Sequence, residues 1–215
     1  MLQKVDKFVP VSRPTLSQET IDEVVRVLES GWLATGPLTQ KFEAALSDYY
    51  DNRRVACFTS ATAGLHAALI AIGVQPGDEV ITTPMTFVAT ANVIAMLGAK
   101  PVFVDIEESD TFNIDVNKIE EACTERTKAI MPVHYAGLSV DLDPLYEIAN
   151  RKNLRVIEDA AHAVGSAYKG SRIGTFGDIQ VFSFHPIKNM TSGEGGCVVL
   201  NSEGESKMLA LQRFH

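Results

Sequence analysis

Lys188 is the residue of this sequence whose surroundings could turn it into a nucleophile. It follows the apolar segment 181–185 and precedes the glycine-rich segment 192–196. A lysine beside a buried strand loses hydration, which lowers its pKa and favours the neutral amine that forms imines with carbonyl groups. The glycines permit a close approach of the backbone or positive φ angles. Taken alone, however, Lys188 is better explained as a solvated lysine in a loop.

A run of hydroxyl residues stands where a predicted strand gives way to a predicted helix, at Thr59, Ser60, Ala61 and Thr62. The free backbone N–H groups of a helix start form an anion site, and the hydroxyl groups add donors, so a phosphate would fit there. Simple N-capping by Ser60 explains the same residues equally well. The run is not a P-loop, because no Gly-Lys-Ser or Gly-Lys-Thr follows it.

Asp159 follows the apolar residues Val156 and Ile157 and precedes the small residues Ala160 and Ala161. A carboxylate at the end of a strand, with little bulk around it, is free to meet a ligand. A helix cap or a structural ion pair is the alternative explanation.

Three histidines, His134, His162 and His185, could be read as metal ligands. Their spacing matches no zinc pattern and no cysteine lies close to them in the sequence, so we predict no metal site. A serine hydrolase is also disfavoured, because the chain has no G-x-S-x-G nucleophile elbow.

These candidate residues need a scaffold, and apolar periodicity predicts strands that alternate with helices. Predicted helices cover residues 18–30, 37–50, 62–72, 87–97, 116–123, 145–151 and 206–214, and the first has an apolar face formed by Ile21, Val24, Val25 and Leu28. Predicted strands cover residues 54–58, 79–83, 101–105, 129–133, 155–158, 179–184 and 196–201. The alternation indicates βαβ units and a mainly parallel sheet, in which ligands bind beyond the carboxyl ends of the strands.

Composition narrows the class of protein further. The 215 residues include 19 basic and 27 acidic side chains, a formal net charge of −8, and 46% are apolar, which fits one large α/β domain. An acidic chain without a basic run disfavours binding to nucleic acid or to an anionic membrane. The three cysteines are far apart, no signal peptide is recognisable and no apolar run could cross a bilayer, so we expect a cytoplasmic protein with reduced thiols.

Six sequence motifs, taken together and in this order, resemble a known protein family, although none of them is specific alone. They are TSATAGLHAAL, GDEVITTPMTFVATANVI, GAKPVFVDI, PVHYAG, VIEDAAHAVG and FSFHPIKNMTSGEGG. They resemble the nucleotide-sugar aminotransferases of the DegT/StrS type, within fold type I of the pyridoxal 5′-phosphate (PLP) enzymes, from near Phe8 to the last residue. The resemblance implies the α/β fold of a three-layer PLP-transferase large domain, with helices on both faces of a mainly parallel mixed sheet.

The resemblance also implies a role for each residue of the site. Lys188 would form the internal aldimine with PLP and later move the proton between substrate and cofactor. Asp159 would pair with the pyridine nitrogen, because a carboxylate keeps that nitrogen protonated and lets the ring take up electrons. Phe87 would stack on the ring face, and His162 would lie near the phenolic oxygen of the ring. The phosphate would be held by Ala61, Thr62 and Ser183.

The same resemblance implies transamination, since dehydratases of this type carry histidine where this chain keeps Lys188. The EDAAHA and PVHYAG motifs are most similar to those of enzymes that aminate carbon 4 of a UDP-linked keto-sugar, with L-glutamate converted to 2-oxoglutarate. The nearest are the UDP-4-amino-4-deoxy-L-arabinose–oxoglutarate aminotransferases of lipopolysaccharide or polysaccharide biosynthesis. Such enzymes work as homodimers.

Relatives of this type continue well past the length of this chain, which stops inside the predicted helix 206–214. We therefore expect residues 1–215 to form a PLP-binding large domain that is incomplete. A smaller C-terminal domain, and an asparagine that reaches the partner's phosphate, would lie beyond His215. The alternative to an aminotransferase is a truncated, inactive chain that binds PLP or pairs with another subunit.

Overall fold

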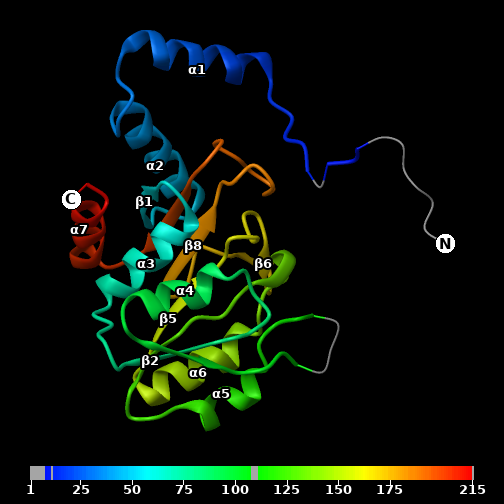
Figure 1. Cartoon of the computed structure of the whole chain (residues 1–215), viewed down its shortest axis with the longest axis vertical. Coiled ribbons are helices and arrows are strands. Elements are labelled where there is room, and N and C mark those ends of the chain that lie inside the picture. The colour runs from blue at the N-terminus through cyan, green and yellow to red at the C-terminus, as the bar shows by residue number, and fades with distance from the viewer. Residues whose placement is uncertain (1–7, 11, 108–110, 215) are drawn as a thin grey trace, which may run out of the picture.

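The computed structural model describes residues 8–10, 12–107 and 111–214 (Figure 1). Its helices are α1 (Gln18–Ser30), α2 (Pro37–Tyr49), α3 (Ala61–Ala71), α4 (Ala89–Met96), α5 (Val116–Ala122), the 3₁₀ turn η1 (Tyr135–Gly137), α6 (Leu142–Lys152) and α7 (Glu203–Gln212). Its strands are β1 (Arg54–Phe58), β2 (Glu79–Thr82), β3 (Lys100–Phe103), β4 (Thr127–Ile130), β5 (Arg155–Asp159), β6 (Ala167–Tyr168), β7 (Ser171–Arg172), β8 (Ile179–Ser183) and β9 (Gly196–Leu200).

A seven-stranded sheet with the order β1-β9-β8-β5-β4-β2-β3 forms the centre of the fold. Parallel pairs join β3 to β2, β2 to β4, β4 to β5 and β5 to β8. Strand β9 runs antiparallel to both of its neighbours, so β1 points in the same direction as β8. The carboxyl ends of all strands of this sheet except β9 therefore lie on the same side of the sheet. This confirms the predicted mainly parallel mixed sheet.

Successive residues of each strand enter two different apolar layers, as the two-residue repeat of a strand requires. Val80 and Ile157 belong to the cluster that also contains residues of α3, α4 and α7. Ile81 and Val156 belong to the cluster that contains residues of α2, α5 and α6. The sheet is thus covered by helices on both faces, which confirms the predicted three-layer architecture.

Helix α1 extends away from the sheet (Figure 1). It forms where predicted, because the Ser17 hydroxyl caps its start and Gly31, with a φ of 70°, ends it. Its predicted apolar face is exposed, and between 44% and 61% of the surface of each residue stays accessible for Ile21, Val24, Val25 and Leu28. Among the helices that the structure describes, none is long and apolar enough to cross a membrane.

Several boundaries differ from the predicted ones, each for a local reason. Helix α4 begins at Ala89 instead of near residue 87, because the Thr86 N–H donates to the Pro84 carbonyl and a tight turn precedes the helix. Helix α6 begins before Pro144, since a proline in the first turn removes no helical hydrogen bond. The unpredicted β6–β7 hairpin turns at Lys169 and Gly170, both with positive φ as a two-residue hairpin turn needs.

Gly196, the first residue of β9, lies against the start of α3. A Cβ atom at this position would stand 2.5 Å from the Ala61 backbone nitrogen and 2.7 Å from the Phe182 carbonyl oxygen. Backbone on both sides leaves no flexible atom that could move away. Only glycine lets β9 pass so close to the first turn of α3.

The Gly196→Ala variant should lose about 1–3 kcal/mol of unfolding free energy, because the methyl group forces two backbone segments apart. Urea unfolding followed by circular dichroism measures the loss. Gly204→Ala is the matched control: Gly204 is exposed in the first turn of α7, the nearest atom to an added Cβ is 4.0 Å away, and alanine there should be neutral or slightly stabilising. Equal stability of the Gly196→Ala variant and the original chain would contradict the close packing.

Candidate active site

A cavity of about 550 Å³ opens at the edge of the sheet where the parallel strands end. It is lined by the turn before α3, the loop before α4, the end of β5 and the loop after β8. The structure brings every predicted site residue to this one cavity: Ala61, Thr62, Phe87, Asp159, His162, Ser183 and Lys188. Their roles toward a cofactor remain predictions.

The turn before α3 has the geometry of an anion site. Ser60 is the N-cap, and its hydroxyl accepts the N–H of Ala63 at 3.1 Å. Ala61 and Thr62 occupy the first helical positions, whose N–H groups have no acceptor within the helix. Ser183, at the end of β8, accepts the His185 N–H on its hydroxyl oxygen at 3.3 Å and keeps its own proton to donate. Capping by Ser60 and anion binding by its neighbours are therefore compatible.

Asp159 is held rigidly at the end of β5, with 5% of its surface exposed. Its backbone N–H donates to the Pro132 carbonyl at 2.8 Å. One carboxylate oxygen accepts the Thr90 hydroxyl at 2.7 Å and the other accepts the Ala161 N–H at 3.2 Å. The carboxylate therefore has a fixed direction, with its remaining lone pairs available toward the cavity.

The preceding residue, Glu158, faces the opposite side of β5 and is fully buried. Its carboxylate accepts hydrogen bonds from Tyr146 at 2.7 Å and from the Gln180 amide. It also lies 2.9 Å from Nε2 of His134, whose Nδ1 accepts the Val140 N–H at 3.2 Å. Nδ1 therefore carries no proton, and the neutral His134 ring donates its Nε2–H to Glu158.

Two of the three histidines have other partners in the structure. Both ring nitrogens of His134 are occupied, and His185 pairs loosely with Glu194 at 3.9 Å. Across the residues described, no cluster of three or more His, Cys, Asp or Glu side chains could hold a metal ion.

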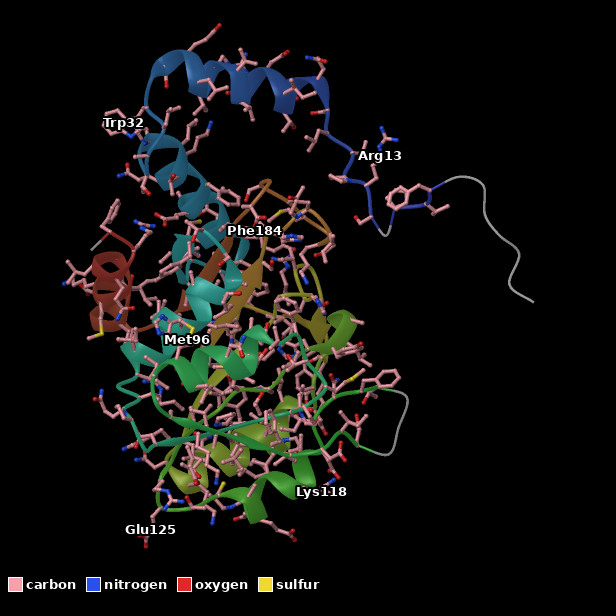
Figure 2. All side chains as sticks on the ribbon, viewed as in Figure 1. Arg13, Trp32, Met96, Lys118, Glu125 and Phe184 are labelled. Carbon is pink, nitrogen blue, oxygen red and sulfur yellow. The ribbon has the colours of Figure 1, made fainter. Side chains whose placement is uncertain are left out.

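Phe184, labelled in Figure 2, closes the base of the loop that carries Lys188 through its backbone hydrogen bonds. The Phe184 N–H donates to the Gly195 carbonyl at 2.9 Å, and its carbonyl accepts the Ser192 N–H at 3.1 Å. Its buried ring meets the Phe42 ring edge-on, with centroids 5.3 Å apart. Both ends of the loop are thereby fixed, which gives Lys188 a defined place beside the cavity.

Lys188 has the environment of a reactive amine. Burial lowers its pKa, while the negative charge of Asp159 opposes that shift. Its backbone N–H donates to the His185 carbonyl at 2.9 Å. A larger neutral fraction of the amine near neutral pH is what attack on a carbonyl carbon requires.

His162 and Phe87 also line the cavity. The Nδ1 atom of His162 accepts the Ala136 N–H at 3.2 Å, and burial together with the charge of Lys188 lowers the pKa of the ring. His162 is therefore neutral and has its Nε2–H free to donate. Phe87 lies in the loop between β2 and α4, 70% exposed, so the face of its ring is accessible.

Three residues of the site have roles that sequence reasoning missed. Thr90 bonds to Asp159 from 69 positions away, Tyr135 lines the cavity beside His162, and Gly196 admits the close approach of β9 to α3. All three stand inside motifs quoted above, Tyr135 within PVHYAG, but only the tertiary structure places them at or next to the site.

Comparisons with known proteins agree with this geometry. Residues 14–215 match the model of the DegT/DnrJ/EryC1/StrS aminotransferase family. The chain is 49% identical over 210 residues to the uncharacterized protein MJ1066 of Methanocaldococcus jannaschii. The alignment covers 98% of this chain and 54% of MJ1066. The PLP-form of the putative sugar aminotransferase Spr1654 from Streptococcus pneumoniae has a TM-score of 0.89 at 38% identity, covering 94% of this chain and 57% of Spr1654. DesI, solved in the presence of its TDP-sugar product, has a TM-score of 0.88 at 36% identity, covering 96% of this chain and 53% of DesI.

The layered, mainly parallel sheet with its edge cavity is the large-domain fold of the fold type I PLP enzymes. The chain belongs to the DegT/DnrJ/EryC1/StrS aminotransferase family, which confirms the family predicted from the six motifs. It spans about half the length of the relatives that it matches.

The residues present fit PLP, the cofactor with which the Spr1654 relative was solved. A helix start offers N–H groups to a phosphate, a fixed carboxylate can face a protonated ring nitrogen, and an amine of lowered pKa can bond to the aldehyde. These three chemistries occur together at one cavity of about 550 Å³, a size that suits a small cofactor.

In the cofactor-free protein, Lys188 should titrate at lower pH than Lys169. Burial lowers the pKa of Lys188, whereas hydrogen bonds to Asp143 and Tyr168 raise the pKa of Lys169. Competitive acetylation across a pH series, with peptide mass spectrometry, measures both residues in one sample. Asp159→Asn should lower the pKa of Lys188 further, because the opposing negative charge is removed. Lys188 that titrates together with Lys169 would contradict the buried environment.

Proposed function

We propose that this chain forms the PLP-binding large domain of an enzyme that transfers an amino group to a nucleotide-linked keto-sugar. The observation that carries the proposal is that Lys188, Asp159 and the start of α3 meet at one cavity. The family of the chain supports the same reaction class. Each residue alone has a simpler explanation: a loop lysine, a structural ion pair or a helix cap. Those explanations do not account for the meeting of all three at one cavity.

The proposed division of labour follows from the chemistry of each group. The N–H groups of Ala61 and Thr62, with the Ser183 hydroxyl, hold the phosphate. Asp159 keeps the ring nitrogen protonated, and Phe87 packs its face against the ring. When bound, the cofactor supplies an electron sink for the electrons released at the reacting carbon.

Lys188 is proposed to have two successive tasks. Its neutral amine would hold the cofactor covalently, and as a free amine it would move a proton at the reacting carbon. The Nε2–H of His162 is proposed to donate to the phenolic oxygen of the ring, since its Nδ1 is already used by the Ala136 N–H.

The substrates are proposed on narrower grounds. The likeness to DesI, solved with a TDP-sugar product, supports a nucleotide sugar as amino acceptor. The EDAAHA and PVHYAG motifs support a 4-keto-sugar linked to UDP, as in the 4-amino-4-deoxy-L-arabinose enzymes, with L-glutamate as donor. We further propose a cytoplasmic homodimer, and the exposed apolar face of α1 supports association with another surface.

The proposal predicts that Lys188→Ala abolishes amination. With PLP, L-glutamate and a UDP- or TDP-linked 4-keto-sugar, mass spectrometry of the amino-sugar product should show a rate at least about 100-fold lower than that of the original chain. Lys169→Ala is the control, because Lys169 is exposed in the β6–β7 turn and lies outside the cavity. PLP binding without any amination by the original chain would favour the alternative of a cofactor-binding chain that is inactive alone.

A further inference from the structure

A threonine behind the wall of the cavity contacts Asp159 directly. Thr90 lies in the first turn of α4, is fully buried, and does not line the cavity. Its hydroxyl oxygen stands 2.7 Å from Oδ2 of Asp159. The contact joins α4 to the end of β5, two elements that are far apart in the sequence.

The hydrogen bonds around Thr90 define which way its single proton points. Three oxygens lie within reach: Oδ2 of Asp159 and the Thr86 hydroxyl at 2.7 Å, and the Phe87 carbonyl at 3.2 Å. A carboxylate and a carbonyl can only accept, and the shorter, charge-assisted bond to Asp159 is the stronger. Thr90 therefore donates to Asp159, and Thr86 donates to Thr90.

This bond decides the orientation of the Asp159 carboxylate. The Ala161 N–H holds Oδ1 at 3.2 Å, a longer bond than the one from Thr90 to Oδ2. Lys188 is close enough for the negative charge of Asp159 to oppose the lowering of the lysine pKa by burial. Without the Thr90 hydroxyl, the carboxylate would be held through Oδ1 alone and could turn toward the lysine.

We propose that Thr90 is a positioning residue that aims the Asp159 carboxylate at the cofactor ring nitrogen. The inference rests on the proposed function, because it takes Asp159 as the partner of that nitrogen. Thr86, which lines the cavity, donates its hydroxyl to Thr90, and Thr90 donates in turn to Asp159.

The test compares three variants of the whole chain. Thr90→Val keeps the shape of the side chain and removes the donor, and Thr90→Ser keeps the donor. Thr82→Val is the matched control, because Thr82 is also fully buried and donates its hydroxyl to the Met131 carbonyl at 2.8 Å rather than to the Asp159 carboxylate. Titration of each protein with PLP gives its dissociation constant, and a pH series of the visible absorption of the bound cofactor gives the midpoint of its titration.

Thr90→Val should bind PLP about tenfold more weakly than the original chain, as loss of a hydrogen bond to a charged group predicts. Its absorption midpoint should move by about half a pH unit or more. Thr90→Ser should restore both values, and Thr82→Val should leave both unchanged.

Three results would overturn the inference, and the third is distinguishable from the first two. If the original chain binds PLP and Thr90→Val matches it, or if Thr82→Val is impaired as much as Thr90→Val, Thr90 does not position Asp159. If the original chain binds no PLP, the proposed function fails and the inference fails with it.

Discussion

Two consecutive buried carboxylates at the end of β5 are the constraint on which the surrounding structure depends. Glu158 is fully buried and Asp159 is 5% exposed, and a buried charge without partners costs several kcal/mol. Because neighbouring residues of a strand face opposite sides of the sheet, the two charges need two separate sets of partners. Glu158 is enclosed by His134, Tyr146 and Gln180. Asp159 is held by donors on one side and left open to the cavity on the other.

The hydrogen-bond network around Glu158 also holds the segment that precedes β8. Gln180 links it to the buried Arg53, whose guanidinium donates to the carbonyls of Gly174, Gly177 and Asp178. This fixes the segment that leads into β8, and β8 leads in turn to the loop of Lys188. The position of Lys188 relative to Asp159 is thus set by the pairing of β5 with β8 and by the anchored ends of the loop.

Much of this arrangement follows from the sequence, because its signals are local. The alternation of strands and helices predicts the parallel sheet, and the parallel sheet predicts that polar residues at strand ends meet. The apolar face of α1 was also recognised, but its exposure depends on what packs around it and could not be predicted. The role of Thr90 could not be predicted for the same reason, since a buried threonine in an apolar helix has no local signature of a bond to Asp159. The hairpin at Lys169 and Gly170 had a weak signal only, as a lysine is unusual at positive φ.

The central claim is that Lys188 is the covalent anchor of PLP, placed there by the same edge of the sheet that presents Asp159. Borohydride reduction of the PLP-loaded chain, followed by peptide mapping with mass spectrometry, tests it most directly. The account predicts a pyridoxyl group on Lys188 and on no other lysine, and a Lys188→Arg chain that takes up no label. A label on another lysine, or an unlabelled Lys188 in a chain that holds PLP, would contradict the account.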